Sequence, residues 1–221
     1  MALLLSGANI ALAEESGGFV GFGVGYGDTK MAVETLYSDT NETENAKDKA
    51  NGVSYGFVAG YKQFFNEYLG LRYYANLDLT HAIEVGKFNT TLVNYGVNVD
   101  FLGNFVVTEI ADFGGFIGLG IGGNTWTGKD IKDIKNSHKN DMELDEGGGT
   151  FKVKDTSFDV ALNVGLRTNI AKYHGVELAV RVPFLNTRLF DVSFTTNGTK
   201  IGIKYEIGQN VRVLARYTFS F

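Results

Sequence analysis

The chain has 221 residues, a formal net charge of −5 and a mean hydropathy close to zero. It contains 29 glycines, one proline and no cysteine, which excludes a disulfide framework and any thiolate metal or redox site. The negative charge argues against a nucleic-acid-binding protein. The sequence contains no uninterrupted run of 18 apolar residues, so it predicts no transmembrane helix. The length suits one sizeable all-β domain.

The N-terminus has the pattern of a secretory signal. A short apolar region ends at Ile10, and Ala11-Leu12-Ala13 forms a small-x-small cleavage site before Glu14. No basic residue precedes Lys30, so we expect the true start to lie upstream. We predict a signal peptide over residues 1–13 and a barrel domain over residues 14–221. The alternative is a buried N-terminal helix.

Six segments alternate apolar and polar or small residues with the period of a β-strand. They are residues 17–27, 51–62, 69–80, 91–101, 113–125 and 157–167. In the first, large residues from Val20 to Tyr26 alternate with Gly21, Gly23 and Gly25. This glycine spacing lacks the strand-turn-helix context of a nucleotide loop. Glycines on the inner face of a narrow barrel would leave space for large side chains from opposite strands.

Polar stretches alternate with short turns between these segments. Residues 28–50, 81–90 and 127–154 predict long outer loops, whereas residues 63–68 and 168–174 predict short inner turns. Residues 102–112 are too apolar for a free loop and predict either extended strands or a short interfacial helix. Trp126, the only tryptophan, is expected in an aromatic girdle at the outer membrane interface.

The tail, residues 175–221, predicts a long hairpin around the type I′ turn signal Asn197-Gly198. Its register pairs apolar residues with apolar residues throughout. The pairs are Phe194–Ile201, Val192–Ile203, Phe190–Tyr205, Val182–Val213, Leu178–Tyr217 and Val176–Phe219. We expect the upper half to project above the membrane, with Pro183 and Gly208 at a bend or bulge. Breaks near Asn186 and at residues 208–210 would instead give ten strands.

One face of each strand is apolar, and the other carries charges. Five basic and four acidic residues form a lumen polar network in this prediction, and they are Arg72, Asp78, Asp100, Asp159, Arg167, Glu177, Arg181, Arg212 and Arg216. Asn76, Asn94, Asn98 and Asn163 share their face. Such groups can pair inside a barrel. A soluble lipocalin-like barrel would turn its apolar face inward, and a solvated sandwich would explain neither the glycine-rich faces nor the signal.

The predicted fold is therefore all-β. We predict an eight-stranded antiparallel transmembrane β-barrel that has long outer loops and a protruding C-terminal hairpin. A barrel of ten strands is the alternative.

Two segments of the last third resemble the C-terminal region of the Helicobacter and Campylobacter type of outer-membrane protein family. Residues 163–171 read Asn-Val-Gly-Leu-Arg-Thr-Asn-Ile-Ala, and residues 174–183 read His-Gly-Val-Glu-Leu-Ala-Val-Arg-Val-Pro. The family shows Gly-Leu/Val-Arg-x-Asn-x-Ala and then His-Gly-Ile-Glu-x-Gly-x-Lys-x-Pro. The chain departs from this pattern at Ala179, where the family often has glycine, and at Arg181 in place of lysine.

The resemblance implies an outer-membrane β-barrel of an epsilonproteobacterium, in a family that includes adhesins and porins. It also implies that the aromatic terminal strand, with Tyr217, Phe219 and Phe221, is the assembly signal that the barrel-assembly machinery recognises. The chain lacks room for the large extracellular adhesin domain of the long family members.

The histidines, His81, His138 and His174, predict neither a metal site nor a catalytic triad. A rim enzyme would need a Ser/His pair, such as His81 or His138 beside Ser38 or Ser137. We expect no enzymatic activity and no cofactor.

Two outer-loop motifs are candidate sites. The acidic cluster at residues 141–146 offers oxygen ligands for calcium, but Lys152 stands where a bidentate glutamate is needed, which favours a solvated loop. Asn41 lies in the extended bacterial glycosylation sequon Asp39-Thr40-Asn41-Glu42-Thr43, whereas Asn89 and Asn197 have only the short form. Asn41 is therefore the candidate glycosylation site.

An eight-stranded interior is about wide enough for side chains to fill. The sequence therefore favours a structural or surface-interaction (adhesion) role through the outer loops over a small porin or channel for ions and small solutes. The expected partners are outer-membrane lipid and lipopolysaccharide, the barrel-assembly machinery, and a host or surface ligand. We expect a monomer in the outer membrane of a Gram-negative bacterium.

Overall fold

The computed structural model describes residues 15–38, 43–84, 88–129, 131–133, 136, 150–196 and 199–221. Four predicted features lie outside these residues: the signal peptide at residues 1–13, Asn41, the acidic cluster at residues 141–146, and the Asn197-Gly198 turn. Ser137 and His138 also lie outside them. No helix among the described residues is long and apolar enough to cross a membrane.

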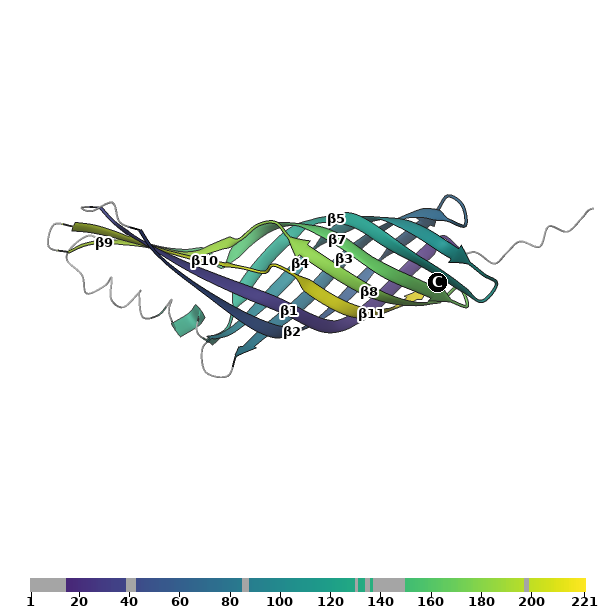
Figure 1. The fold of residues 1–221 in the computed structure, drawn as a ribbon, viewed down its shortest axis with the longest axis horizontal. Coiled ribbons are helices and arrows are strands. Elements are labelled where there is room, and N and C mark those ends of the chain that lie inside the picture. Colours follow the sequence, from purple (N-terminus) through teal and green to yellow (C-terminus); the bar gives the residue numbers. More distant parts are fainter. Residues whose placement is uncertain are drawn as a thin grey trace, which may run out of the picture.

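The described residues form one antiparallel sheet (Figure 1). Its strands are β1 (Gly17–Tyr37), β2 (Thr43–Phe64), β3 (Leu69–Glu84), β4 (Phe88–Val107), β5 (Ala111–Thr127), β6 (Thr150–Val153), β7 (Thr156–Ile170), β8 (His174–Pro183), β9 (Thr187–Thr196), β10 (Thr199–Gly208) and β11 (Arg212–Ser220). Eight of them, in the order β1-β2-β3-β4-β5-β7-β8-β11, close into a ring because β11 pairs with β1. The eight-stranded barrel is confirmed, and the ten-stranded alternative is wrong.

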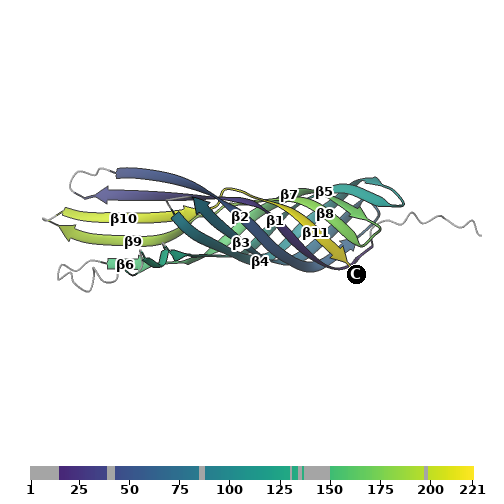
Figure 2. The ribbon, with the colours of Figure 1, turned by 90° about the horizontal axis from the view of Figure 1, so that it is seen from below.

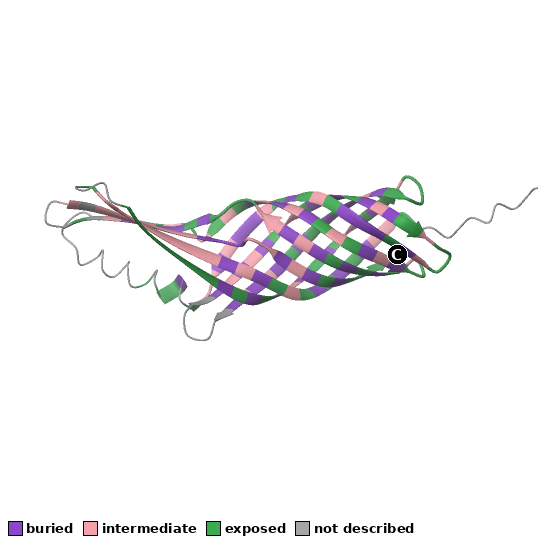
Figure 3. Ribbon diagram, in the orientation of Figure 1, coloured by how far each residue is buried: buried purple, intermediate pink, exposed green. Residues whose placement is uncertain are grey.

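The barrel wall carries its apolar side chains on the outside. Phe57 and Leu119 are each 57% exposed, whereas the inward Arg72 and Asp100 are each 0% exposed. Inward residues that are buried alternate with more exposed outward residues over most of the wall (Figure 3). This arrangement is the reverse of a water-soluble core and matches a wall surrounded by lipid.

The two ends of the barrel differ. At the inner end, adjacent strands are joined by tight turns at residues 65–68, 108–110 and 171–173. The Asn66 side-chain oxygen accepts bonds from the backbone N–H groups of Tyr68 and Leu69, each at 2.9 Å. Residues 102–112 continue β4 and β5, so the extended-strand alternative for this segment is the correct one.

At the outer end, five strands project beyond the barrel as one sheet in the order β2-β1-β10-β9-β6 (Figure 2). We call it the projecting sheet. The protruding β9–β10 hairpin is as predicted, but the expected loop over residues 28–50 is wrong. β1 continues to Tyr37 and β2 begins at Thr43, and the two remain paired along their whole projecting length.

The predicted register is confirmed above the membrane, where Phe194 pairs with Ile201 and Phe190 with Tyr205. In the barrel it is wrong by two residues, because Val213 pairs with Val180 and not with Val182. One residue of this shift is a bulge in β9, where Leu189 has no partner in β10. The rest arises at the breaks over residues 184–186 and 209–211. A shift of two residues preserves which face each side chain takes.

The breaks follow Pro183 and Gly208, the two residues expected at a bend. Here β1 changes partner: Gly27 pairs with Arg212 of β11, and Lys30 pairs with Gly208 of β10. The Asp28 carboxylate fills this junction. It accepts bonds from the Asn210 backbone N–H at 2.7 Å, the Asn210 side-chain amide at 2.7 Å and the Val211 N–H at 2.9 Å.

Candidate functional site

Arg72 on β3 is the centre of the polar network in the inner half of the barrel. Its Nη2 lies 2.7 Å from Oδ2 of Asp100, and its Nη1 contacts the Glu177 carboxylate on β8. The second oxygen of Glu177 lies 3.1 Å from Nη1 of Arg216. Three strands lie between β3 and β8 in each direction around the ring. The Arg72–Glu177 contact therefore spans the lumen from one wall to the opposite wall.

Aromatic rings enclose the Arg72 guanidinium group. Its central carbon lies 5.6 Å from the ring centroid of Phe19, 4.9 Å from that of Tyr74 and 4.6 Å from that of Phe116. These distances are in the range of cation–π contacts, which are strongest where water is excluded. The rings fill the lumen around the ion pairs.

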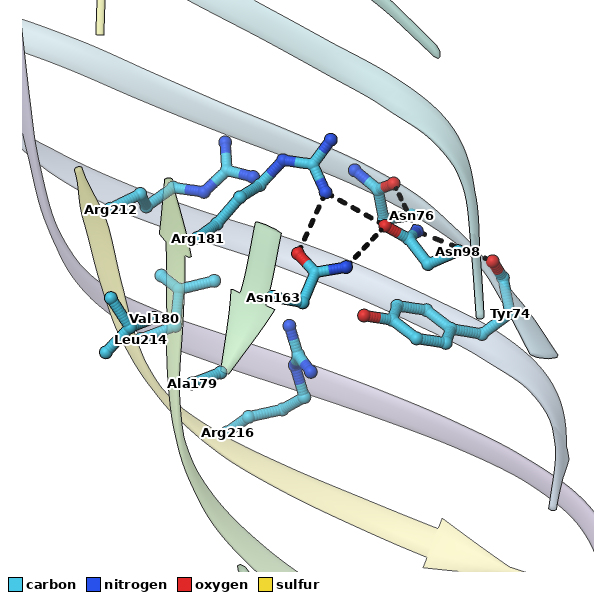
Figure 4. Close-up of a pocket in the computed structure, with 10 residues that line it drawn as sticks. All are labelled: Tyr74, Asn76, Asn98, Asn163, Ala179, Val180, Arg181, Arg212, Leu214 and Arg216. Carbon is cyan, nitrogen blue, oxygen red and sulfur yellow. Dashed lines mark hydrogen bonds between the residues drawn. The ribbon is translucent and has the colours of Figure 1, made fainter. Parts of the chain in front are cut away.

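A second group of ion pairs lies closer to the outer end. Nη2 of Arg212 is 2.7 Å from Oδ2 of Asp78, and Nη2 of Arg181 is 2.8 Å from Oδ2 of Asp159. Asparagines join the pairs: Nη1 of Arg181 donates to the side-chain oxygens of Asn98 at 2.9 Å and Asn163 at 3.0 Å (Figure 4). A cavity of about 20 Å³ remains between these side chains, which is room for about one water molecule.

The structure places all nine predicted network residues inside the barrel, each at most 8% exposed. Eight of them form the ion pairs described above. The ninth, Arg167, lies opposite Glu177 in the β7–β8 register, with its guanidinium carbon 5.5 Å from the Phe64 ring centroid. Lys62 was missed: it is 2% exposed, and its Nζ donates to Oγ of Ser220 at 2.9 Å. Its inward position in the alternation of β2 could have predicted that it belongs to the network.

Glycines on the inner face leave the space that these side chains occupy. A β-carbon added at Gly56 would overlap the Asp78 carboxylate, and one added at Gly120 would overlap the Asn98 amide oxygen. Both crowding groups come from the paired position on the adjacent strand, not from the opposite wall. The glycines do leave space for inward side chains, but the prediction that these side chains come from opposite strands is wrong.

An apolar cluster closes the outer mouth of the barrel. This mouth cluster consists of Leu92, Trp126, Ile131, Leu189, Phe190 and Ile207, each at most 3% exposed. Trp126 is 2% exposed, and its Nε1 donates to Oγ1 of Thr187 at 3.1 Å. The predicted girdle position of Trp126 is therefore wrong, because it shares the inward parity of Asn124 on β5.

Tyrosine–histidine pairs lie on the outer surface of the wall instead. Near the outer end, Oη of Tyr55 is 2.7 Å from Nε2 of His81, whose Nδ1 is 2.8 Å from Oγ1 of Thr91. At the inner end, Nδ1 of His174 is 2.7 Å from Oη of Tyr217. Both described histidines are thus engaged by tyrosine or threonine hydroxyls. Among the described residues, no group of three His, Asp or Glu side chains could hold a metal ion.

The predicted assembly residues lie on the lipid-facing side of the closing strand. Tyr217 and Phe219 on β11 are 48% and 39% exposed, and Phe221 directly after it is 70% exposed. The Phe221 N–H donates to the Gly18 carbonyl oxygen at 2.9 Å. The C-terminus is thereby held against the first strand.

The polarity of the two faces is reversed in the projecting sheet. Inside the membrane, Phe22 and Val24 of β1 face outward, yet the next outward positions include Lys30 and Glu34. The opposite face becomes apolar in the projecting sheet. It carries Met31, Val33 and Tyr37 of β1, Ile201, Ile203 and Tyr205 of β10, and Val192 of β9. At its base this apolar face contributes Phe190 and Ile207 to the mouth cluster.

The geometry agrees with the relationships of the sequence. Residues 56–221 match the family described as Helicobacter outer membrane protein. Comparison with curated proteins gives no match.

Solved structures that are similar at low identity include the following three. They are OprG from Pseudomonas aeruginosa (12% identity, TM-score 0.49, 95% of this chain and 98% of that chain), Neisserial surface protein A (13%, 0.44, 89% and 97%) and Ail of Yersinia pestis (12%, 0.30, 89% and 97%). Because the family match covers more than half of the chain and the ring of eight strands turns its apolar face outward, the protein belongs to the Helicobacter outer membrane protein family and is an integral β-barrel of the Gram-negative outer membrane.

Proposed function

We propose that this protein is a non-conducting barrel that holds the projecting sheet above the membrane for contact with a surface partner. The observation that carries the proposal is the reversed polarity of β1, which places Val33 on an apolar face and Glu34 on a polar face outside the bilayer. A sheet with one apolar face gains free energy by packing that face on another surface. Among the described residues, the mouth cluster covers the base of this face.

The filled lumen argues against the alternative role as a porin or channel. The Arg72–Glu177 contact crosses the barrel, the cavity between the outer ion pairs is only about 20 Å³, and the mouth cluster closes the outer end. We expect planar bilayers containing the purified protein to show no stable unitary conductance. Stable, large conductance steps from the folded protein would contradict this part of the proposal.

We also infer that the protein is not an enzyme. His81 and His174 are engaged by tyrosine and threonine hydroxyls, and neither pairs with a serine in the hydrogen bonds described above. Incubation of the folded protein with phospholipid vesicles should release no fatty acid. Release of fatty acid, with or without calcium, would instead support a catalytic site at the rim of the barrel.

Adhesion of cells that carry the protein on their surface tests the contact role. The double variant Val33→Thr, Ile203→Thr places a polar side chain on the apolar face of each of two neighbouring strands, β1 and β10. Threonine is β-branched like the residues it replaces, so the preference for a strand is retained. The matched control is Glu34→Thr with Lys204→Thr, which changes the polar face of the same two strands. We expect the first variant to lose binding to epithelial monolayers and the control to retain it. Equal binding by both variants, or no binding by the parent above empty cells, would refute the proposal.

The location in the membrane implies an oligomeric state and one further partner. We infer that the barrel is monomeric and that the assembly machinery recognises the strand that carries Tyr217, Phe219 and Phe221. Replacing Phe221 by serine should reduce the amount of heat-modifiable protein in the outer membrane. An unchanged amount would argue against this signal.

A further inference from the structure

A cleft of about 790 Å³ lies at the base of the projecting sheet, on its polar face. Its walls come from β6 and the residue that follows it, from the start of β7, and from β9 and β10. The volume is within the usual range for a site that binds a small organic group. The charged residues that line it are Lys152, Lys154, Arg188, Asp191 and Glu206.

The cleft opens where the hydrocarbon region of the membrane ends. Ser157 and Asn186 line the cleft, and each has a large, exposed apolar neighbour in the sequence. Phe158, which follows Ser157, is 60% exposed, and Leu185, which precedes Asn186, is 42% exposed. Phe184 is 58% exposed, and its N–H donates to the Val160 carbonyl of β7 at 2.8 Å. Such side chains belong among the acyl chains. A molecule in the cleft is therefore level with the headgroups of the outer leaflet.

The charges in the cleft are only partly compensated. Nη1 of Arg188 is 3.9 Å from Asp191, and its Nε is 3.7 Å from Glu206, so both pairs are longer than a hydrogen bond. Among the described residues, no ion pair involves Lys152 or Lys154. Three cations and two carboxylates leave a charge of +1 (3 − 2) in the cleft. This set suits an anionic group attached to a hydroxyl-rich molecule.

We propose that this cleft binds the phosphorylated sugar headgroup of an outer-leaflet glycolipid, the lipid A portion of lipopolysaccharide. Lys152, Lys154 and Arg188 donate to the phosphate, and charge-assisted bonds of this kind are the stronger ones. Asp191 and Glu206 accept from sugar hydroxyls. The acyl chains run down the wall over Phe158 and Phe184. The site does not depend on the apolar face of the projecting sheet.

The test uses the folded protein in non-ionic detergent, with native mass spectrometry to count bound lipid. The probes are bisphosphorylated lipid A and the same lipid after removal of its phosphates. The variant Lys152→Gln, Lys154→Gln, Arg188→Gln removes the three cations of the cleft. The matched control Lys47→Gln, Lys49→Gln removes two cations from the same polar face, but from β2 at the far edge of the sheet.

The cleft variant should bind bisphosphorylated lipid A about tenfold more weakly than the parent, which corresponds to about 1.4 kcal/mol. The control should bind like the parent, and the parent should bind the dephosphorylated lipid about tenfold more weakly. Equal weakening in both variants, or equal binding of both lipids, would overturn the proposal. Full displacement of the lipid by excess inorganic phosphate would assign the cleft to free phosphate and also overturn it.

Each variant is first checked for the heat-dependent shift in gel mobility that marks a folded barrel. If the triple variant does not fold, Lys154→Gln alone supplies the test, because Lys154 lies outside the strands. Unchanged lipid binding by that single variant would count against the proposal. Loss of adhesion in the apolar-face variant with lipid binding intact would separate this site from the contact surface.

Discussion

The guanidinium group of Arg72 on β3 contacts the carboxylate of Glu177 on β8, 105 residues later and on the opposite wall of the ring. Because each group has a second partner, Asp100 for Arg72 and Arg216 for Glu177, one chain of ion pairs joins strands β4, β3, β8 and β11. The stability of the barrel therefore depends on contacts across its interior as well as on the hydrogen bonds around its wall.

Replacing Arg72 by methionine should destabilise the barrel strongly. The change leaves the buried Asp100 carboxylate and one oxygen of Glu177 without their cation, and a broken buried pair costs about 3–5 kcal/mol. Urea unfolding in detergent, followed by the mobility shift of the folded barrel, measures the loss. The added change Glu177→Gln should recover part of it by removing one uncompensated charge.

The matched control for this change is Lys204→Ala. Lys204 lies 3.5 Å from Glu34 in the projecting sheet, where the two side chains are 30% and 41% exposed. Surface pairs contribute about 0–1 kcal/mol. If Arg72→Met unfolds at the same urea concentration as this control, the interior ion pairs do not hold the walls together.

Replacing Gly120 by alanine should also destabilise the barrel, by about 1–3 kcal/mol, as overpacking does. The added β-carbon would overlap the Asn98 oxygen and lie 2.7 Å from Nη1 of Arg181, so both side chains must move. The control is Gly103→Ala, because a β-carbon there meets nothing within 4 Å. The same unfolding measurement applies, and equal midpoints for the two alanine variants would be the contrary result.

The fluorescence of Trp126 should report the mouth of the barrel and not the lipid. It is the only tryptophan and is 2% exposed beneath the projecting sheet. We expect brominated acyl chains in the bilayer and aqueous iodide each to quench it weakly. Strong quenching by brominated lipid would return Trp126 to the girdle. The variant Leu189→Ala should increase iodide quenching, because it removes a neighbour from the mouth cluster.

The change Asp28→Ala should loosen the junction between barrel and projecting sheet while leaving the barrel intact. Three hydrogen bonds from Asn210 and Val211 would lose their acceptor. Bonds to a charged group contribute about 1.5–3 kcal/mol each, so cleavage by added protease near residue 210 should accelerate about tenfold or more. The control Asp48→Ala removes an exposed carboxylate that, among the described residues, accepts from the neighbouring Lys49 N–H. Equal cleavage of the two variants would show that Asp28 does not hold the junction.

The barrel and its interior were predictable from alternation alone. Strand parity is a local property, so it identified Arg72 and Glu177 as inward residues without knowledge of their contact. The partners across the lumen were not predictable, because they depend on the tilt and closure of the ring. Lys62, at the end of its predicted strand, was missed although its parity was inward.

The projecting sheet was missed for a different reason. Residues 28–50 are polar on average, yet Met31, Val33 and Tyr37 alternate with Lys30 and Glu34, and the average hides this pattern. Trp126 was misplaced because tryptophan at a strand end suggests an interface, whereas its parity alone directs it inward. The barrel register was wrong by two residues because a bulge at Leu189 and chain breaks leave no clear trace in the sequence.

The reversal of polarity along β1 also fixes how deeply the molecule sits in the bilayer. Tyr26 and Lys30 occupy outward positions only four residues apart, and each residue advances the strand by about 3.3 Å. If the barrel moved inward by one two-residue repeat of the strand, Lys30, Lys47 and Lys49 would approach the hydrocarbon region. The free-energy cost of burying a lysine there rises to about 2–4 kcal/mol at the midplane. Rising would expose Val24 and its neighbours to water. The pattern of side chains along β1 thus sets the depth of the barrel in the bilayer. A force that pulls on the projecting sheet is opposed by the free energy needed to move the barrel relative to the membrane.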